Sequence, residues 1–196
     1  MYNFIKIFNK AALRTFLCLI LVCVLTGCSG TQAEKSTSEK KSGKRSLALH
    51  QEMSAGNEAP DFSAKLNNGE TFSLSDAKGQ VILLNFWATW CNNCVKEMPA
   101  IEKLYEEYGD QITIIGVNVG EDKDTVDTFI EAKNYSFPIA YDTDSEISNL
   151  YPSAGIPYTV IIGKDGLVTE TFLGAKDADS QYTKLRRALK EAYEAN

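Results

Sequence analysis

The amino-acid sequence predicts an α/β domain in which helices flank a mixed β-sheet. Residues 81–87 form an apolar run of strand length, and residues 95–108 follow with the spacing of a helix that buries one face. Residues 158–162 and 168–173 have the pattern of two antiparallel strands joined by a glycine-containing turn. With 196 residues, 44% of them hydrophobic, the chain has room for one such domain plus appendages.

The remaining elements follow from the same periodicities. In chain order they are a strand at 112–119, a helix at 124–134, a short strand at 138–141, a helix at 145–150 and a last helix at 180–194. The last helix is amphipathic, and we expect Tyr182, Leu185 and Leu189 on its inner face.

The first residues predict a targeting signal and not part of the fold. Lys6, Lys10 and Arg14 precede an uncharged apolar run at 16–25, which is shorter than the ~20 residues that span a membrane. Leu25-Thr26-Gly27-Cys28 follows, and it resembles the bacterial lipobox. That resemblance implies a lipoprotein signal peptide at 1–27, cleavage before Cys28 and lipid on its sulfur. An ordinary secretory signal is the alternative.

Residues after Cys28 are rich in Ser, Thr, Lys, Glu and Gly, so they cannot bury enough apolar surface to fold. We therefore expect three parts: the signal peptide at 1–27, the lipidated cysteine with a flexible tether at 28–50, and the domain at 51–196. The expected location is extracytoplasmic, with the lipid holding the protein on the cell membrane.

The net charge of −6 and the isoelectric point near 4.9 do not predict nucleic-acid binding. The expected domain is a monomer. No metal site is expected, because zinc prefers four ligands and the sole histidine, His50, lies near the tether.

The cysteines are the candidate reactive groups. Of five, Cys18 and Cys23 would leave with the signal peptide and Cys28 would carry lipid, so Cys91 and Cys94 remain as thiols. A loop with two intervening residues gains little stability from closure, so this spacing favours reversible chemistry over a structural disulfide.

Cys91 falls at the first turn of a helix that follows a buried strand. Unpaired N–H groups and the helix dipole favour a thiolate there, and thiolate is the attacking species in disulfide exchange. Cys94, one turn later, can resolve the mixed disulfide. Asn92 and Asn93 provide no cation to stabilise the thiolate strongly, which favours a reducing protein.

The segment Asn85-Phe86-Trp87-Ala88-Thr89-Trp90-Cys91-Asn92-Asn93-Cys94-Val95-Lys96-Glu97-Met98-Pro99 resembles the active-site segment of thioredoxin-like proteins, specifically the TlpA/ResA branch. Ala59-Pro60-Asp61-Phe62, Gly69 and Phe72-Ser73-Leu74-Ser75 resemble its N-terminal hairpin, and Gly155-Ile156-Pro157-Tyr158-Thr159 resembles its cis-proline loop. The similarity covers about residues 56–194. It implies a thioredoxin-like sheet with an N-terminal β-hairpin and a central αβ insertion.

The resemblance also implies roles for single residues. Pro157 would be cis and lie opposite the dithiol, with the backbone of Ile156 touching the cysteines and Trp90 forming an apolar platform. Glu97 stands at the position where the branch has a glutamate that moves protons during exchange; an exposed helix glutamate is the alternative. The branch usually has proline where this chain has Asn93.

No cofactor is expected beyond the redox-active pair Cys91 and Cys94. The resemblance implies protein disulfides as substrates, either in apocytochromes c, with electrons from a membrane CcdA-type donor, or in methionine sulfoxide reductases.

Three other functions are alternatives to thiol–disulfide exchange. A peroxiredoxin would have a Pro-x-x-x-Thr-x-x-Cys motif, and no proline precedes Cys91 in that window. A copper-delivery lipoprotein would have a Cys-x-x-x-Cys pair and a distant histidine. A non-enzymatic binding lipoprotein would not depend on Cys91.

Overall fold

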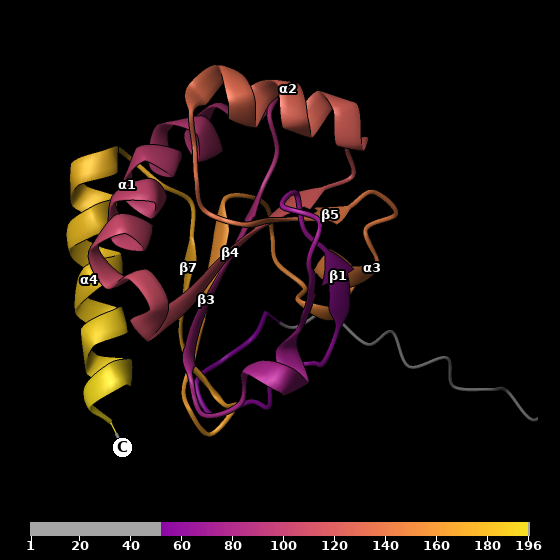
Figure 1. Cartoon of the computed structure of the whole chain (residues 1–196). Helices are drawn as coiled ribbons and strands as arrows, with labels where there is room; N and C mark the ends of the chain where they lie inside the picture. The colour runs from indigo at the N-terminus through magenta and orange to yellow at the C-terminus, as the bar shows by residue number, and fades with distance from the viewer. Residues whose placement is uncertain (1–51, 196) are drawn as a thin grey trace, which may run out of the picture. The chain divides into compact units, whose positions relative to one another are not determined.

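A five-stranded sheet forms the centre of the structure, a computed structural model that describes residues 52–195. The expected signal peptide, Cys28 and the tether to residue 50 lie outside these residues. The strand order is β5-β4-β3-β6-β7. Figure 1 labels β3, β4, β5 and β7 of this sheet. The strands are β3 Val81–Trp87, β4 Ile112–Val119, β5 Ile139–Asp142, β6 Tyr158–Ile162 and β7 Val168–Leu173.

The sheet is mixed, as the sequence predicts. Strand β3 pairs parallel to β4, and β4 pairs parallel to β5. On its other side β3 pairs antiparallel to β6, which pairs antiparallel to β7. Central β3 is buried along its whole length because a cluster of apolar side chains covers each of its two faces.

The helices and the hairpin cover opposite faces of this sheet. Helices α1 Asn92–Tyr108 and α2 Lys123–Lys133 connect parallel strands, and right-handed crossovers in one direction put both helices on one face. Helix α4 Ala178–Glu194 packs beside α1 on that face. The hairpin β1 Ser63–Lys65 and β2 Thr71–Ser73 and the short helix α3 Glu146–Leu150 lie on the other side (Figure 1). Two 3-10 turns, η1 Leu74–Ala77 and η2 Gly109–Gln111, complete the order.

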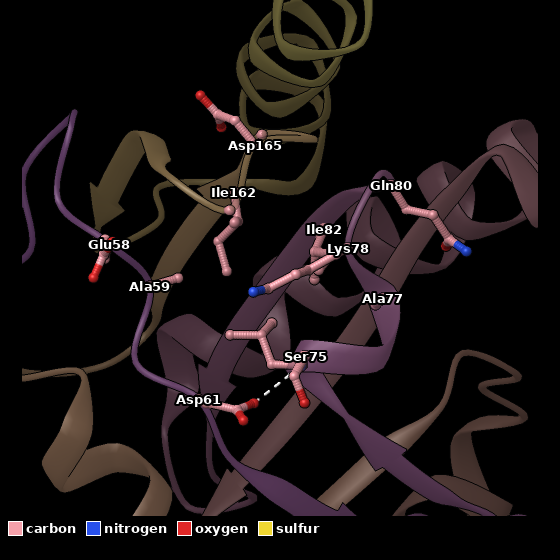
Figure 2. A pocket seen from close by; sticks show the side chains of 13 residues that line it. Glu58, Ala59, Asp61, Ser75, Ala77, Lys78, Gln80, Ile82, Ile162 and Asp165 are labelled. Atoms are coloured by element: carbon pink, nitrogen blue, oxygen red, sulfur yellow. Dashed lines mark hydrogen bonds between the residues drawn. The ribbon is translucent and has the colours of Figure 1, made fainter.

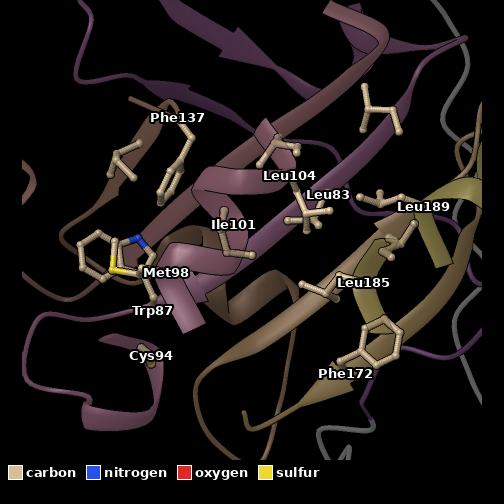
Figure 3. Packing of buried hydrophobic residues seen from close by; sticks show 14 of the residues in the cluster. Leu83, Trp87, Cys94, Met98, Ile101, Leu104, Phe137, Phe172, Leu185 and Leu189 are labelled. Carbon is tan, nitrogen blue, oxygen red and sulfur yellow. The ribbon is translucent and has the colours of Figure 1, made fainter. Parts of the chain in front are cut away.

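Alternation along β3 determines which face each side chain joins. Val81, Leu83 and Trp87 enter the core under α1 and α4, together with apolar side chains of both helices. Figure 3 shows Leu83 and Trp87 among them. Ile82, Leu84 and Phe86 enter the second core, beneath the hairpin and α3. Asn85 lies between Leu83 and Trp87 in this alternation, so its side chain points to the same face of the sheet, toward α1 and α4.

Several element boundaries differ from the sequence expectation by one to three residues. Helix α1 begins at Asn92 and not at residue 95, because Cys91 caps it. Helix α4 begins at Ala178 because the Asp177 side chain accepts the Ser180 N–H at 2.8 Å. Helix α2 likewise begins after Asp122, which accepts the Thr125 N–H at 2.9 Å. Such caps satisfy N–H groups that a hydrophobic pattern does not reveal.

Candidate active site

The two cysteines lie where β3 ends and α1 begins. Cys91 is the N-cap of α1, and its Sγ accepts the backbone N–H of Cys94 at 3.2 Å. The two sulfurs are joined in a disulfide with the Cα atoms 5.2 Å apart. After reduction, the N–H group and the positive end of the helix dipole would both stabilise a thiolate at Cys91.

The cysteines differ in exposure. Both are largely buried, but Cys91 is 8% exposed and Cys94 only 1%, so Cys91 is the closer of the two to the surface. The more exposed cysteine is thus the one whose position at the helix start predicts attack on a partner disulfide.

The loop before β6 lies against Cys91. The Ile156–Pro157 peptide bond is cis, as the resemblance implied. The carbonyl oxygen of Ile156 is 3.6 Å from Cys91 Sγ, which is the expected backbone contact. Trp90 is 68% exposed beside the pair, and it is the most exposed of the large apolar side chains in the described residues.

Glu97 lies in the first turns of α1 and is only 1% exposed. Gln181 Nε2 donates to one of its carboxyl oxygens at 2.7 Å, and Asn85 Nδ2 donates to the other at 3.2 Å. Asn85 Nδ2 also donates to Thr159 Oγ1 at 3.0 Å. Four polar side chains from α1, β3, β6 and α4 therefore satisfy one another inside the core, as buried polar groups require.

Burial decides the protonation of this carboxyl. Removal from water disfavours the charged form and raises the pKa of Glu97 from 4.5 to about 7, although hydrogen bonds from its neighbours partly oppose the shift. The alternative of an exposed helix glutamate is excluded by the burial. A group with this pKa exchanges protons readily near neutral pH.

Sequence reasoning did not identify Gln181 and Thr159 as members of this cluster. The inner face of α4 was expected to include Tyr182, which is half-buried and packs at the edge of the core. The fully inward position is Gln181, 4% exposed, four residues before Leu185 and eight before Leu189. The sequence did contain a sign of this, because Gln181 has the helical spacing of the apolar residues Leu185 and Leu189 and so shares their buried face. Thr159 is opposite Asn85 in the β3–β6 register, which no local pattern reveals.

Two cavities lie at opposite ends of β3. One, of about 340 Å³, is an open groove lined by Trp90, Ile156, Phe86 and residues of α3 and the loop after it. The other, of about 200 Å³, lies near the start of β3, where Lys78, Asp61 and Asp165 surround an apolar floor (Figure 2). Only the first adjoins the cysteines.

Within residues 52–195 no three His, Cys, Asp or Glu side chains are grouped as metal ligands. Over the same stretch, no helix is long and apolar enough to span a bilayer.

A thioredoxin-like sheet with a reversible cysteine pair at a helix N-terminus defines a thiol–disulfide oxidoreductase. Residues 55–171 match the AhpC/TSA family, and the chain belongs to this family. It is 35% identical to the thioredoxin-like protein YneN of Bacillus subtilis, over 88% of this chain and 98% of that protein. It is 34% identical to the thiol-disulfide oxidoreductase ResA of Bacillus subtilis, over 85% of this chain and 86% of ResA.

A solved structure agrees with these relatives. The thiol:disulfide interchange protein of the thioredoxin family from Chlorobium tepidum has a TM-score of 0.61 and 25% identity, covering 71% of this chain and 98% of its own. The predicted fold class, the family resemblance and the thiol–disulfide oxidoreductase activity are thereby confirmed.

Proposed function

We propose that this oxidoreductase reduces disulfides in exported proteins, and that a lipid on Cys28 holds it on the outer side of the cell membrane. The observation that carries the proposal is the unequal exposure of the pair: Cys91 is 8% exposed and its neighbours Trp90 and Ile156 line an open groove, whereas Cys94 is 1% exposed. A partner disulfide can then reach one sulfur while the second is kept back for resolution.

The exchange transfers two electrons to the partner. The Cys91 thiolate attacks one sulfur of the partner disulfide, that S–S bond breaks, and the displaced sulfur takes up a proton. Cys94 then loses its proton and attacks Cys91 Sγ, which releases the partner's second sulfur as a thiol. The products are a reduced partner and the Cys91–Cys94 disulfide, which a separate dithiol donor must reduce again.

Glu97 is suited to the proton transfers. It is three residues after Cys94 in α1, so the two side chains share one face of the helix. With a pKa of about 7 it can take the Cys94 proton as base and return it later as acid.

The expected direction is reduction of the partner. A strong oxidant needs a very stable thiolate in its reduced form. Asn92 and Asn93, the two residues between the cysteines, are uncharged and exposed, so the thiolate would have the helix terminus and no adjacent cation.

The groove beside Cys91 supports a polypeptide partner and not a small disulfide. Trp90 and Ile156 form one end of it, and Tyr151 and Pro152 continue the apolar surface away from the cysteines. A partner segment lying across the Ile156 carbonyl would present its disulfide to Cys91 and a flanking apolar side chain to the groove.

The resemblance to the TlpA/ResA branch supports two classes of partner. One is the paired haem-binding cysteines of apocytochromes c, and the other is the disulfide of methionine sulfoxide reductases. The same resemblance supports a CcdA-type membrane protein as electron donor. We propose the protein as a monomer that needs no bound cofactor.

Trapping the mixed disulfide tests this function. In full-length protein carrying Cys94→Ser, the partner stays attached to Cys91 because nothing resolves it. After rapid alkylation of free thiols, mass spectrometry is expected to identify exported proteins with paired cysteines.

The double variant Cys91→Ser, Cys94→Ser is the control and should trap nothing. Absence of any Cys91-linked protein, or partners confined to the cytoplasm, would overturn the proposal. Peroxide consumption above background would instead favour a peroxidase, and tight copper binding a copper-delivery protein.

A further inference from the structure

The Glu121 side chain is hydrogen-bonded to the turn that precedes Cys91. Its carboxylate accepts the Thr89 N–H at 2.7 Å and the Thr89 hydroxyl at 2.5 Å. Asn118, which is fully buried, donates its side-chain amide to the same carboxylate at 2.7 Å. Three hydrogen bonds to an ionised acceptor are strong ones, and two of them come from one residue of the active-site turn.

Sheet topology brings these residues together. β3 and β4 are parallel neighbours, so their carboxyl ends meet at one edge of the sheet. Thr89 is two residues after β3, and Glu121 is two residues after β4. The contact joins positions 32 residues apart in the chain.

The turn between β3 and α1 is thus fixed on both sides of Cys91. Before it, Thr89 is bound to Glu121, and the Cys91 N–H donates to the Ala88 carbonyl at 3.1 Å. After it, Cys91 caps α1. We infer that Glu121 is a positioning residue: it holds the turn so that Cys91 faces Cys94, and it thereby keeps the disulfide hard to reduce.

Two physical effects act in the same direction. A fixed turn keeps the two sulfurs close in the dithiol, which favours closing the disulfide. In addition, the carboxylate lies within about 10 Å of the Cys91 backbone nitrogen, since it is 2.7 Å from the Thr89 nitrogen and two residues span at most about 7 Å, and a negative charge on this side of the turn disfavours the thiolate. Both effects favour the oxidised protein and so make the dithiol a better reductant. The inference rests on disulfide exchange itself and not on the identity of the partner.

A second glutamate supplies a matched control. Glu102 accepts the Ser136 N–H at 2.9 Å and the Ser136 hydroxyl at 2.5 Å, which is the same two-point contact on a different loop. Glu102 is ten residues into α1, about 15 Å along the axis from its first residue. It stabilises the loop before β5 and has no part in the reactive turn.

The test is the equilibrium of the full-length protein with glutathione, read by alkylation and mass spectrometry of the Cys91–Cys94 peptide. Glu121→Gln removes the charge and one acceptor. The measured quantity is the squared concentration of reduced glutathione divided by the concentration of oxidised glutathione when half of the protein is oxidised. In Glu121→Gln it is expected to fall by about two- to tenfold, because the disulfide becomes easier to reduce. Glu102→Gln should leave it unchanged, although both variants lose stability.

Thr89→Ser keeps both donors and should match the wild type, whereas Thr89→Val loses the hydroxyl and should shift the ratio in the same direction by less. Thr89→Val also provides the measurement if Glu121→Gln does not fold. The inference fails if Glu121→Gln and Glu102→Gln give the same glutathione equilibrium, or if Thr89→Ser shifts it as far as Glu121→Gln.

Discussion

At the carboxyl end of β3, polar side chains are buried and bonded to one another, whereas at its amino end they line an open pocket in contact with water. Glu97 and Gln181 are sealed in the core next to the cysteines. Lys78 and Asp165, at the other end, are exposed (Figure 2).

The difference shows where chemistry can be expected. Water solvates the charge of an exposed side chain, so such a group needs no partner inside the protein. A buried carboxyl loses that solvation, which raises the pKa of Glu97, and retaining a charged group in a core lowers the stability of the protein. Five predictions, from the largest expected effect to the smallest, test whether function is confined to the buried end.

Glu97→Gln should have the largest effect. Removing the base is expected to slow reduction of a protein disulfide about 100-fold at pH 7, as measured by stopped-flow fluorescence. Exposed Glu106 on the same helix is the control, and Glu106→Gln should leave the rate unchanged. Equal rates for the two variants would mean that the buried carboxyl takes no part in exchange.

Glu97 should also make the free energy of unfolding depend on pH. Its pKa is about 7 in the folded protein and 4.5 as its ordinary value, so the folded state binds the extra proton between these values. The contribution of Glu97 to the free energy of unfolding should therefore be greatest below pH 4.5. It should fall by about 3 kcal/mol as the pH rises through 7. Urea titrations of Glu97→Gln should lack this decrease.

Trp90→Ala tests the groove at the reactive end. Losing the exposed aromatic surface should raise KM for a peptide disulfide about tenfold, while reaction with a small disulfide stays within about twofold. Stability should change little because the side chain is 68% exposed. Tyr193→Ala, another exposed aromatic on α4, is the control. An equal loss for both disulfides would place Trp90 in the chemical step.

Gln181→Leu should shift the pH profile of exchange. The Gln181 amide favours the ionised form of Glu97, so its loss raises the pKa of that carboxyl further. The midpoint of the rate profile is expected to rise by about half to one pH unit. Gln80→Leu, at the amino end of β3, should leave the midpoint where it is.

Lys78→Ala should have the smallest effect. The side chain is exposed at the pocket of Figure 2, far along β3 from the cysteines. Exchange rate and stability are expected to stay within about twofold and 0.5 kcal/mol of the wild type. A severalfold loss of exchange with protein disulfides would show that this end also binds the partner.

Strands were predicted more accurately than helix starts. Expected ranges 81–87, 112–119, 158–162 and 168–173 coincide with β3, β4, β6 and β7. Each is an apolar run bounded by polar or turn residues, so the strand and its ends are visible together. The starts of α1, α2 and α4 depend on capping side chains, and the short α3 begins at Glu146, one residue after Ser145 in a left-handed conformation.

By itself the sequence determined the reactive pair, its position between a strand and a helix, and the mixed sheet, because spacing and periodicity are local properties. Only the tertiary structure decided what surrounds the pair. Gln181 and Glu97 are 84 residues apart, Cys91 and Ile156 are 65 apart, and Thr89 and Glu121 are 32 apart. These contacts depend on strand order and on which helices share a face, and no local pattern along the chain records them.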